Sequence, residues 1–253
     1  MFNPYDATSE LVNQRAWCLE ERLLSARKIV YASDTLHNYF QSAVTSIGSA
    51  LSVPRNAERL PDVMFVPDAD MAVHVAGCKH SNWREVDFVW ADVIGNYTSR
   101  AVTKPKDKLT ALAGVAEQFD HVWHSSFLGG SNTNDRTHIK RRYLAGLLER
   151  TLLRDLLWLR GEGTPGPRPN PYFAPSWSWA SVHGKINLYH AMDRALEPTY
   201  LDDPSHLKSC EILDCNVVVE DEQLPHGRVK SGVLNLRAKV ISTTWTGGSY
   251  DSE

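Results

Sequence analysis

The sequence predicts an α+β protein, and two patterns in different parts of the chain support this prediction. In the middle of the chain, apolar residues recur three and four positions apart, which is typical of amphipathic helices. In the C-terminal third, Val, Ile, Thr and Leu predominate in runs separated by turn residues, which is typical of antiparallel strands. The chain has 253 residues, of which 42% are hydrophobic and 23% charged, the composition of an ordinary globular protein with a sizeable core.

The first predicted helix starts almost at the N-terminus. Thr8 or Ser9 can cap it, and Leu11, Leu19 and Leu23 belong to its apolar stripe. A run rich in β-branched and aromatic residues follows, and prolines then interrupt an irregular stretch. The predicted helices span residues 8–25, 83–100, 107–123 and 140–160. The predicted strands span residues 28–32, 71–76, 176–182, 212–220 and 229–245.

The strand predicted at residues 176–182 alternates with period two, so it would place Trp177 and Trp179 on one face. Before it, glycines and prolines at 161–171 exclude regular structure for about a dozen residues and mark the best boundary in the chain. The chain is therefore divided into an N-terminal section, an irregular and helical section, a linker and a β-rich section. These cover residues 1–53, 54–160, 161–173 and 174–253.

Charge and hydropathy exclude several classes of function. Lysine and arginine number 27 and aspartate and glutamate 30, so the net charge of −3 provides no overall positive field for nucleic acid or an anionic membrane. The apolar stretches are far shorter than the roughly 20 residues of a membrane span, and the N-terminus lacks the apolar core of a signal peptide. Four cysteines are too few for a disulfide framework. These features predict a cytosolic or nuclear protein with free thiols.

No motif in the chain is sufficient by itself for catalysis or metal binding. Gly161-x-Gly163-x-x-Gly166 has the glycine spacing of a dinucleotide loop, but it follows a predicted helix and its prolines remove amide donors. Cys210 and Cys215 lie in a predicted strand without zinc-ligand spacing, so packed thiols are expected and no metal is predicted.

The first predicted helix offers one candidate site. At 100° per residue, Trp17 and Glu21 fall together on the side opposite the buried stripe. An aromatic ring beside a carboxylate can stack on a nucleotide and stabilise a sugar cation. In the alternative interpretation, Glu21 is a solvated helix residue and Trp17 packs on a neighbouring element.

The segment Arg15-Ala16-Trp17-Cys18-Leu19-Glu20-Glu21-Arg22-Leu23-Leu24-Ser25 resembles the third block of the fungal heterokaryon-incompatibility (HET) domain, R-x-W-T-L-Q-E-R-L-L-S-P-R. Five further segments occur in the order seen downstream of that block in HET-domain proteins. They are Tyr97–Arg100, Lys106–Ala116, Tyr143–Leu147, Asp155–Trp158 and Ala174–Val182. The first two HET blocks have no counterpart, because only fourteen residues precede Arg15. We therefore expect the C-terminal remnant of a TIR-like α/β HET domain, followed by a helical section and an antiparallel β-rich section.

The resemblance implies a role in self/non-self recognition that leads to programmed cell death after incompatible hyphal fusion, in the cytoplasm. HET domains are distantly similar to TIR domains, some of which cleave NAD with a glutamate on the corresponding helix. By this resemblance Glu21 is the catalytic residue and Trp17 binds substrate. NAD would be a substrate, and no bound cofactor is expected. The strands that would complete a TIR-like pocket belong to the missing blocks.

Two hypotheses follow. In the first, the chain is a NAD-cleaving effector completed by a longer gene product or a partner chain. In the second, it is a non-catalytic, truncated interaction module that binds a protein partner or itself, and neither nucleic acid nor a membrane.

Overall fold

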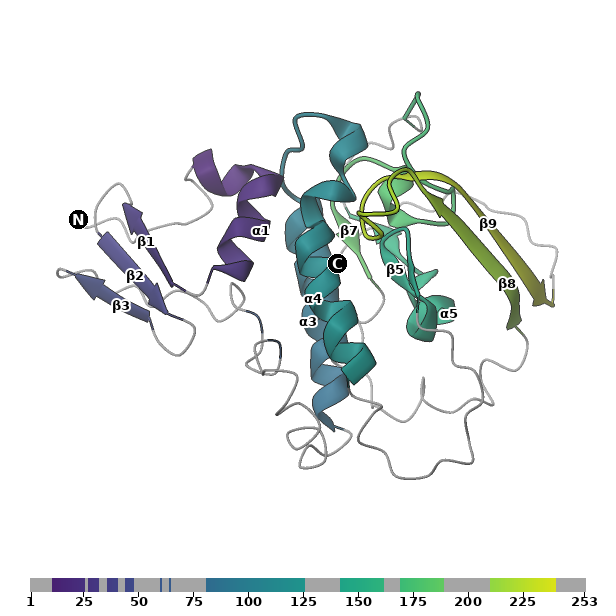
Figure 1. Cartoon of the computed structure of the whole chain (residues 1–253), viewed down its shortest axis with the longest axis horizontal. Coiled ribbons are helices and arrows are strands. Elements are labelled where there is room, and N and C mark those ends of the chain that lie inside the picture. Colours follow the sequence, from purple (N-terminus) through teal and green to yellow (C-terminus); the bar gives the residue numbers. More distant parts are fainter. Residues whose placement is uncertain are drawn as a thin grey trace, which may run out of the picture.

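The computed structural model combines helices with small antiparallel sheets, so the predicted α+β class is confirmed (Figure 1). It describes residues 11–25, 27–31, 36–40, 44–47, 60, 64, 81–125, 142–161, 169–188 and 210–239. Two upright helices, α3 and α4, stand in the middle of Figure 1. Helix α1 and a three-stranded sheet lie on one side of them, and the short strands and a long hairpin lie on the other.

The N-terminal section begins with the 3-10 turn η1 (Leu11–Gln14) and helix α1 (Ala16–Leu24). The predicted helix at 8–25 is therefore shorter, and its first residues lie outside the described part. Strands β1 (Arg27–Tyr31), β2 (Leu36–Phe40) and β3 (Val44–Ile47) form an antiparallel meander. Strand β1 matches the strand predicted at 28–32, whereas β2 and β3 were not predicted.

Helices α3 (Ser81–Thr98) and α4 (Ala113–Ser125) confirm two predicted helices. The segment between them contains two 3-10 turns, η4 (Pro105–Asp107) and η5 (Thr110–Leu112), so the helix predicted from 107 takes its α form only at Ala113. The backbone amide of Ala16 donates to the carbonyl of Ala101, and the amide of Ala101 donates to Gln14, which joins the start of α1 to the end of α3.

The helix predicted at 140–160 is wrong. In its place are strands β4 (Tyr143–Leu144) and β5 (Leu147–Leu148), then η6 (Glu149–Thr151), the single-turn helix α5 (Leu152–Asp155) and strand β6 (Leu159–Arg160). Ala145 and Gly146 have φ angles of 50° and 98°, which form the tight hairpin turn between β4 and β5. A continuous helix cannot pass through two residues in the left-handed conformation. The apolar residues that suggested a helix are therefore distributed over a series of short turns and strands.

The strand predicted at 176–182 is also wrong. Its residues form turns and the 3-10 helix η7 (Trp179–Ser181), and the hydroxyl of Ser178 accepts a hydrogen bond from the amide of Ala180. Strand β7 (Ile186–Asn187) follows and pairs with β6. Serine at the start of a turn satisfies amides that a strand would present to a neighbour, which explains why the alternating pattern does not produce a strand here.

The C-terminal hairpin confirms the two predicted antiparallel strands, although β9 ends at Ala238 and residues 240–245 of the second predicted strand lie outside the described part. Strand β8 (Cys210–Val219) pairs with β9 (Val229–Ala238), and Pro225, His226 and Gly227 lie in the turn as predicted. Alternate residues, among them Cys215 and Val229, face the core. Cys18, Cys210 and Cys215 are free thiols. The strand predicted at 71–76 and most of the predicted linker lie outside the described residues.

One apolar core connects these elements. Its largest fully buried side chains come from α3, η5, α4, the β4–β5 hairpin, α5 and η7, together with two isolated residues. They are Trp90, Trp179, Tyr97, Phe119, Leu60, Met64, Ile94, Leu112, Leu144, Leu147 and Leu152. Trp90 and Phe119 join α3 to α4 with their ring centroids 4.9 Å apart. In the part of the chain that the structure describes, no helix has the length and apolar character that a membrane span requires.

Candidate functional site

Trp17 and Glu21, the two residues singled out in the sequence, lie on the outer side of α1. The Trp17 side chain is 36% exposed, and Glu21 is exposed as well. The opposite side of the helix buries Ala16, Leu19 and Leu23. The helical-wheel prediction therefore describes this face correctly: ring and carboxylate are one turn apart and both reach solvent.

Glu20 carries a half-buried carboxylate on α1, and the sequence pattern did not indicate it. Its Oε1 accepts a hydrogen bond of 2.9 Å from the amide of Gly114, in the first turn of α4. The pKa of Glu20 is raised above its ordinary value, mainly by burial. The hydrogen bond from the Gly114 amide opposes this increase, and the charge of Glu21 adds to it. A carboxylate at a helix N-terminus accepts a hydrogen bond from a free backbone amide and interacts favourably with the helix dipole. Glu20 therefore has a packing role, and its partner 94 residues away could not be found from the local pattern.

Four of the six segments with the HET resemblance meet around Trp179. This side chain is fully buried, and its indole Nε1 donates to the carbonyl of Gly146 at 2.8 Å. The hydroxyl of the neighbouring Ser178 donates to the carbonyl of Ala145 at 2.5 Å. Both acceptors lie in the β4–β5 turn. A β-carbon on Gly146 would come within 2.7 Å of the indole ring, so only glycine fits beneath Trp179.

Lys108, in the segment between α3 and α4, also contacts Trp179. Its ammonium donates to the carbonyl of Val182 at 2.6 Å and lies 5.1 Å from the centre of the Trp179 ring. The hydroxyl of Tyr97 donates to the backbone carbonyl of Lys108 at 2.5 Å. Lys108 is only 8% exposed, and burial together with the charge of Arg160 lowers its pKa to about 8. We refer to Tyr97, Lys108, Ala145, Gly146, Ser178, Trp179 and Val182 as the Trp179 junction.

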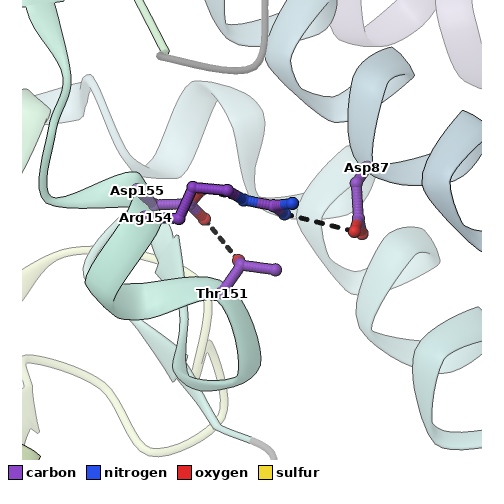
Figure 2. Close-up of polar contacts among 4 residues, drawn as sticks. All are labelled: Asp87, Thr151, Arg154 and Asp155. Carbon is purple, nitrogen blue, oxygen red and sulfur yellow. Dashed lines mark hydrogen bonds and ion pairs between the residues drawn. The ribbon is translucent and has the colours of Figure 1, made fainter. Parts of the chain in front are cut away.

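A second set of buried polar contacts lies around Asp155 (Figure 2). The hydroxyl of Thr151 donates to Oδ2 of Asp155 at 2.5 Å, and Asp155 is 1% exposed. Arg154, the residue before Asp155 on α5, extends toward α3. One of its terminal nitrogens lies 3.2 Å from Oδ2 of Asp87. These contacts hold α5 against α3. Nearby in sequence, the indole of Trp158 donates to the carbonyl of Trp177 at 2.9 Å.

A third polar contact attaches the β8–β9 hairpin to α4. Nε2 of His226 lies 3.3 Å from Oδ2 of Asp120, and the His226 ring lies 5.0 Å from that of Tyr143. A carboxylate that orients an imidazole is the arrangement of a general base. Here the neighbouring group is the Tyr143 phenol, whose pKa burial raises well above its usual range. The His226–Asp120 pair therefore lies beside a neutral phenol ring and connects the β8–β9 hairpin to α4.

The polar contacts of Glu20, Trp179, Asp155 and His226 involve different partner residues. Within the described ranges, no group of three or more His, Cys, Asp or Glu side chains is arranged to hold a metal ion. Trp17 and Glu21 lie next to each other, but neither belongs to the Trp179 junction.

Comparison with known proteins gave no match: no family model, no curated protein and no solved structure is similar to this chain at a significant level. The contacts within the chain are therefore the basis for assigning its function.

Proposed function

We propose that this chain is a HET-type protein of fungal self/non-self recognition, acting in the cytoplasm through a protein partner or through self-association and leading to programmed cell death. The observation that carries the proposal is the Trp179 junction. Four segments that resemble HET blocks contribute to it, with Tyr97, Lys108, Gly146 and Trp179 as their central residues.

The side-chain donors in this junction all belong to segments that carry the resemblance. The indole N–H of Trp179, the hydroxyl of Ser178 and the ammonium of Lys108 each donate to a backbone carbonyl of another such segment. These hydrogen bonds between segments support a common structural plan with HET-domain proteins.

Exposed apolar side chains in the N-terminal section support a role in association. Ile29 is 60% and Tyr31 85% exposed on the same face of β1, and Leu11 is 78% exposed. Apolar surface of this kind favours contacts with another protein. This section would act as a non-catalytic interaction module.

Expression of the chain in a filamentous fungus tests the proposal. We expect induction to raise the fraction of hyphal compartments that take up a dye excluded by living cells. Trp179→Ala, which removes the centre of the junction, should abolish this effect, whereas Tyr172→Ala, at a half-exposed aromatic residue outside the junction, should retain it. The proposal fails if the wild-type chain accumulates in the hyphae and their viability equals that of an empty-vector strain.

A second candidate function is NAD cleavage, and the exposure of Trp17 and Glu21 on one face of α1 favours it. The carboxylate of Glu21 would stabilise the positive charge that develops on the ribose as the bond to nicotinamide breaks, while Trp17 stacks on a ring of the substrate. In this case a longer gene product or a partner chain would complete the pocket.

Loss of NAD in the presence of the purified chain tests this second candidate. We expect Glu21→Gln to slow cleavage by about a hundredfold or more, as removal of a group that stabilises the transition state does. Glu117→Gln, at an exposed glutamate of α4, is the matched control and should cleave at the wild-type rate. A Glu21→Gln protein that consumes NAD as fast as the parent would exclude a catalytic role.

A further inference from the structure

The turn between η7 and β7 brings basic side chains from three parts of the chain together. The carbonyl of Val182 accepts from the ammonium of Lys108 at 2.6 Å. Two residues later, a β-carbon on Gly184 would lie 3.4 Å from Nε and 3.7 Å from a terminal nitrogen of Arg160, so the guanidinium lies directly against this glycine. The amide of Gly161 donates to the carbonyl of Lys185 at 2.8 Å, which holds the turn beside the end of β6.

The positive charges of this turn are close enough to affect one another. The charge of Arg160 contributes to the lowered pKa of Lys108. Burial lowers the pKa of the His183 imidazole, and the charges of Lys108 and Arg160 lower it further. The ring of Phe173 lies edge-on to that of His183, with 6.2 Å between the ring centroids. Two cationic groups, Lys108 and Arg160, therefore act on one imidazole.

No carboxylate compensates these charges among the residues that the structure describes. The ion pairs there involve other cations, namely Arg142, Arg154, His226, Arg228 and Arg237. The carbonyls of Val182 and Trp179 accept from Lys108 but carry no net charge. Like charges without a counter-ion repel each other, and a bound anion would remove that repulsion.

The turn is open to a ligand from solvent. His183, Gly184 and Lys185 are exposed, and Arg160 is half-buried. Gly184 has a φ of 95°, a backbone conformation that favours glycine, so no side chain covers the guanidinium at this point. Lys108 lies beneath the surface and contributes its charge from below.

We propose that Arg160 and His183 bind a phosphate group at this turn, over the buried charge of Lys108. The planar guanidinium of Arg160 offers two parallel N–H donors that match two phosphate oxygens, and the imidazole of His183 offers a further donor. The ligand is a phosphate-bearing small molecule, with the phosphate either free or part of a nucleotide. The site stands apart from Trp17 and Glu21 and does not depend on the proposed function.

Titration of the full-length chain with inorganic phosphate and with ADP tests the proposal, with sodium chloride of equal ionic strength as the reference. Calorimetry should give saturable binding. Nuclear magnetic resonance of the His183 imidazole should show its pKa rising when phosphate is added, because the anion offsets the charges of Arg160 and Lys108. Tighter binding of ADP than of phosphate assigns the site to nucleotides, and equal binding assigns it to a single phosphoryl group.

Arg160→Gln should weaken binding about tenfold, since a charge-assisted pair of hydrogen bonds is lost. Arg237→Gln is the matched control, because this arginine is exposed on β9 and pairs with Glu211. If Arg160→Gln does not fold, His183→Gln, at an exposed side chain, provides the same comparison. Binding no stronger than that in sodium chloride, or unchanged binding by the folded Arg160 and His183 variants, would overturn the proposal.

Discussion

Two tryptophans in segments with the HET resemblance lie in opposite environments. Trp179 is fully buried, and its indole N–H, its ring face and its backbone carbonyl all have partners within the Trp179 junction. Trp17 is 36% exposed on the outer face of α1. The comparison shows that sequence resemblance does not by itself assign a role, because one residue type organises the core in one segment and forms surface in the other.

The largest effect expected from this comparison is on stability. Trp179→Ala should lower the free energy of unfolding by about 3–5 kcal/mol, as large-to-small substitutions of core aromatics do. Trp17→Ala should lower it by at most about 1 kcal/mol, because this ring is partly in solvent already. Urea unfolding measures both.

If the Trp179→Ala chain does not fold, Trp179→Phe provides the measurement. It keeps an aromatic ring but leaves the carbonyl of Gly146 without its donor, which should cost about 1–2 kcal/mol. Equal losses of stability for substitutions at Trp17 and Trp179 would contradict the difference between the two regions.

The next effect concerns the pH dependence of the junction. The pKa of Lys108 is about 8 in the folded chain, below its ordinary value of 10.5. Between these pH values the unfolded chain binds more protons, so the contribution of Lys108 to the free energy of unfolding increases as pH rises from about 8 to 10.5. The increase should be about 3 kcal/mol, since one pKa unit corresponds to about 1.4 kcal/mol.

Urea unfolding of wild type and Lys108→Met over this pH range isolates the effect. Other groups titrate there in both proteins, so the difference between the two curves reports on Lys108 alone. Parallel curves would mean that the ammonium has the same pKa in the folded and unfolded chains.

The smallest effect distinguishes the two neighbouring glutamates of α1. Glu20→Ala should lower the free energy of unfolding by about 1 kcal/mol, because the amide of Gly114 loses its acceptor at the start of α4. Glu21→Ala should change it by less than about 0.5 kcal/mol, as expected for an exposed side chain.

Glu20→Gln is the control for this pair, because its amide oxygen can still accept from Gly114 and it should retain nearly wild-type stability. The measurement is urea unfolding at neutral pH. A larger loss for Glu21→Ala than for Glu20→Ala would reverse the assignment of the half-buried and solvent-facing carboxylates.

Long periodic segments were predicted most completely from the sequence, and most short elements were not, although the five-residue strand β1 was. The helices α3 and α4 and the strands β8 and β9 extend over at least ten residues, so their repeating apolar positions distinguish a helix from a strand. Residues 140–160 and 176–182 contain equally apolar patterns, but their regular elements are four residues or fewer. In such short runs the periodicity is ambiguous, and turns at Gly146 and Ser178 decide the outcome.

By itself the sequence determined the α+β class, the two central helices, the C-terminal hairpin and the face of α1 that carries Trp17 and Glu21. All of these depend on residues within one or two turns or strands of each other. Only the tertiary structure decided which polar groups become partners: Glu20 with Gly114, Trp179 with Gly146, and Lys108 and Arg160 with the turn at 182–185. These partners are separated by 24 to 94 residues, and a buried donor is matched to its acceptor by packing, which local sequence patterns do not encode.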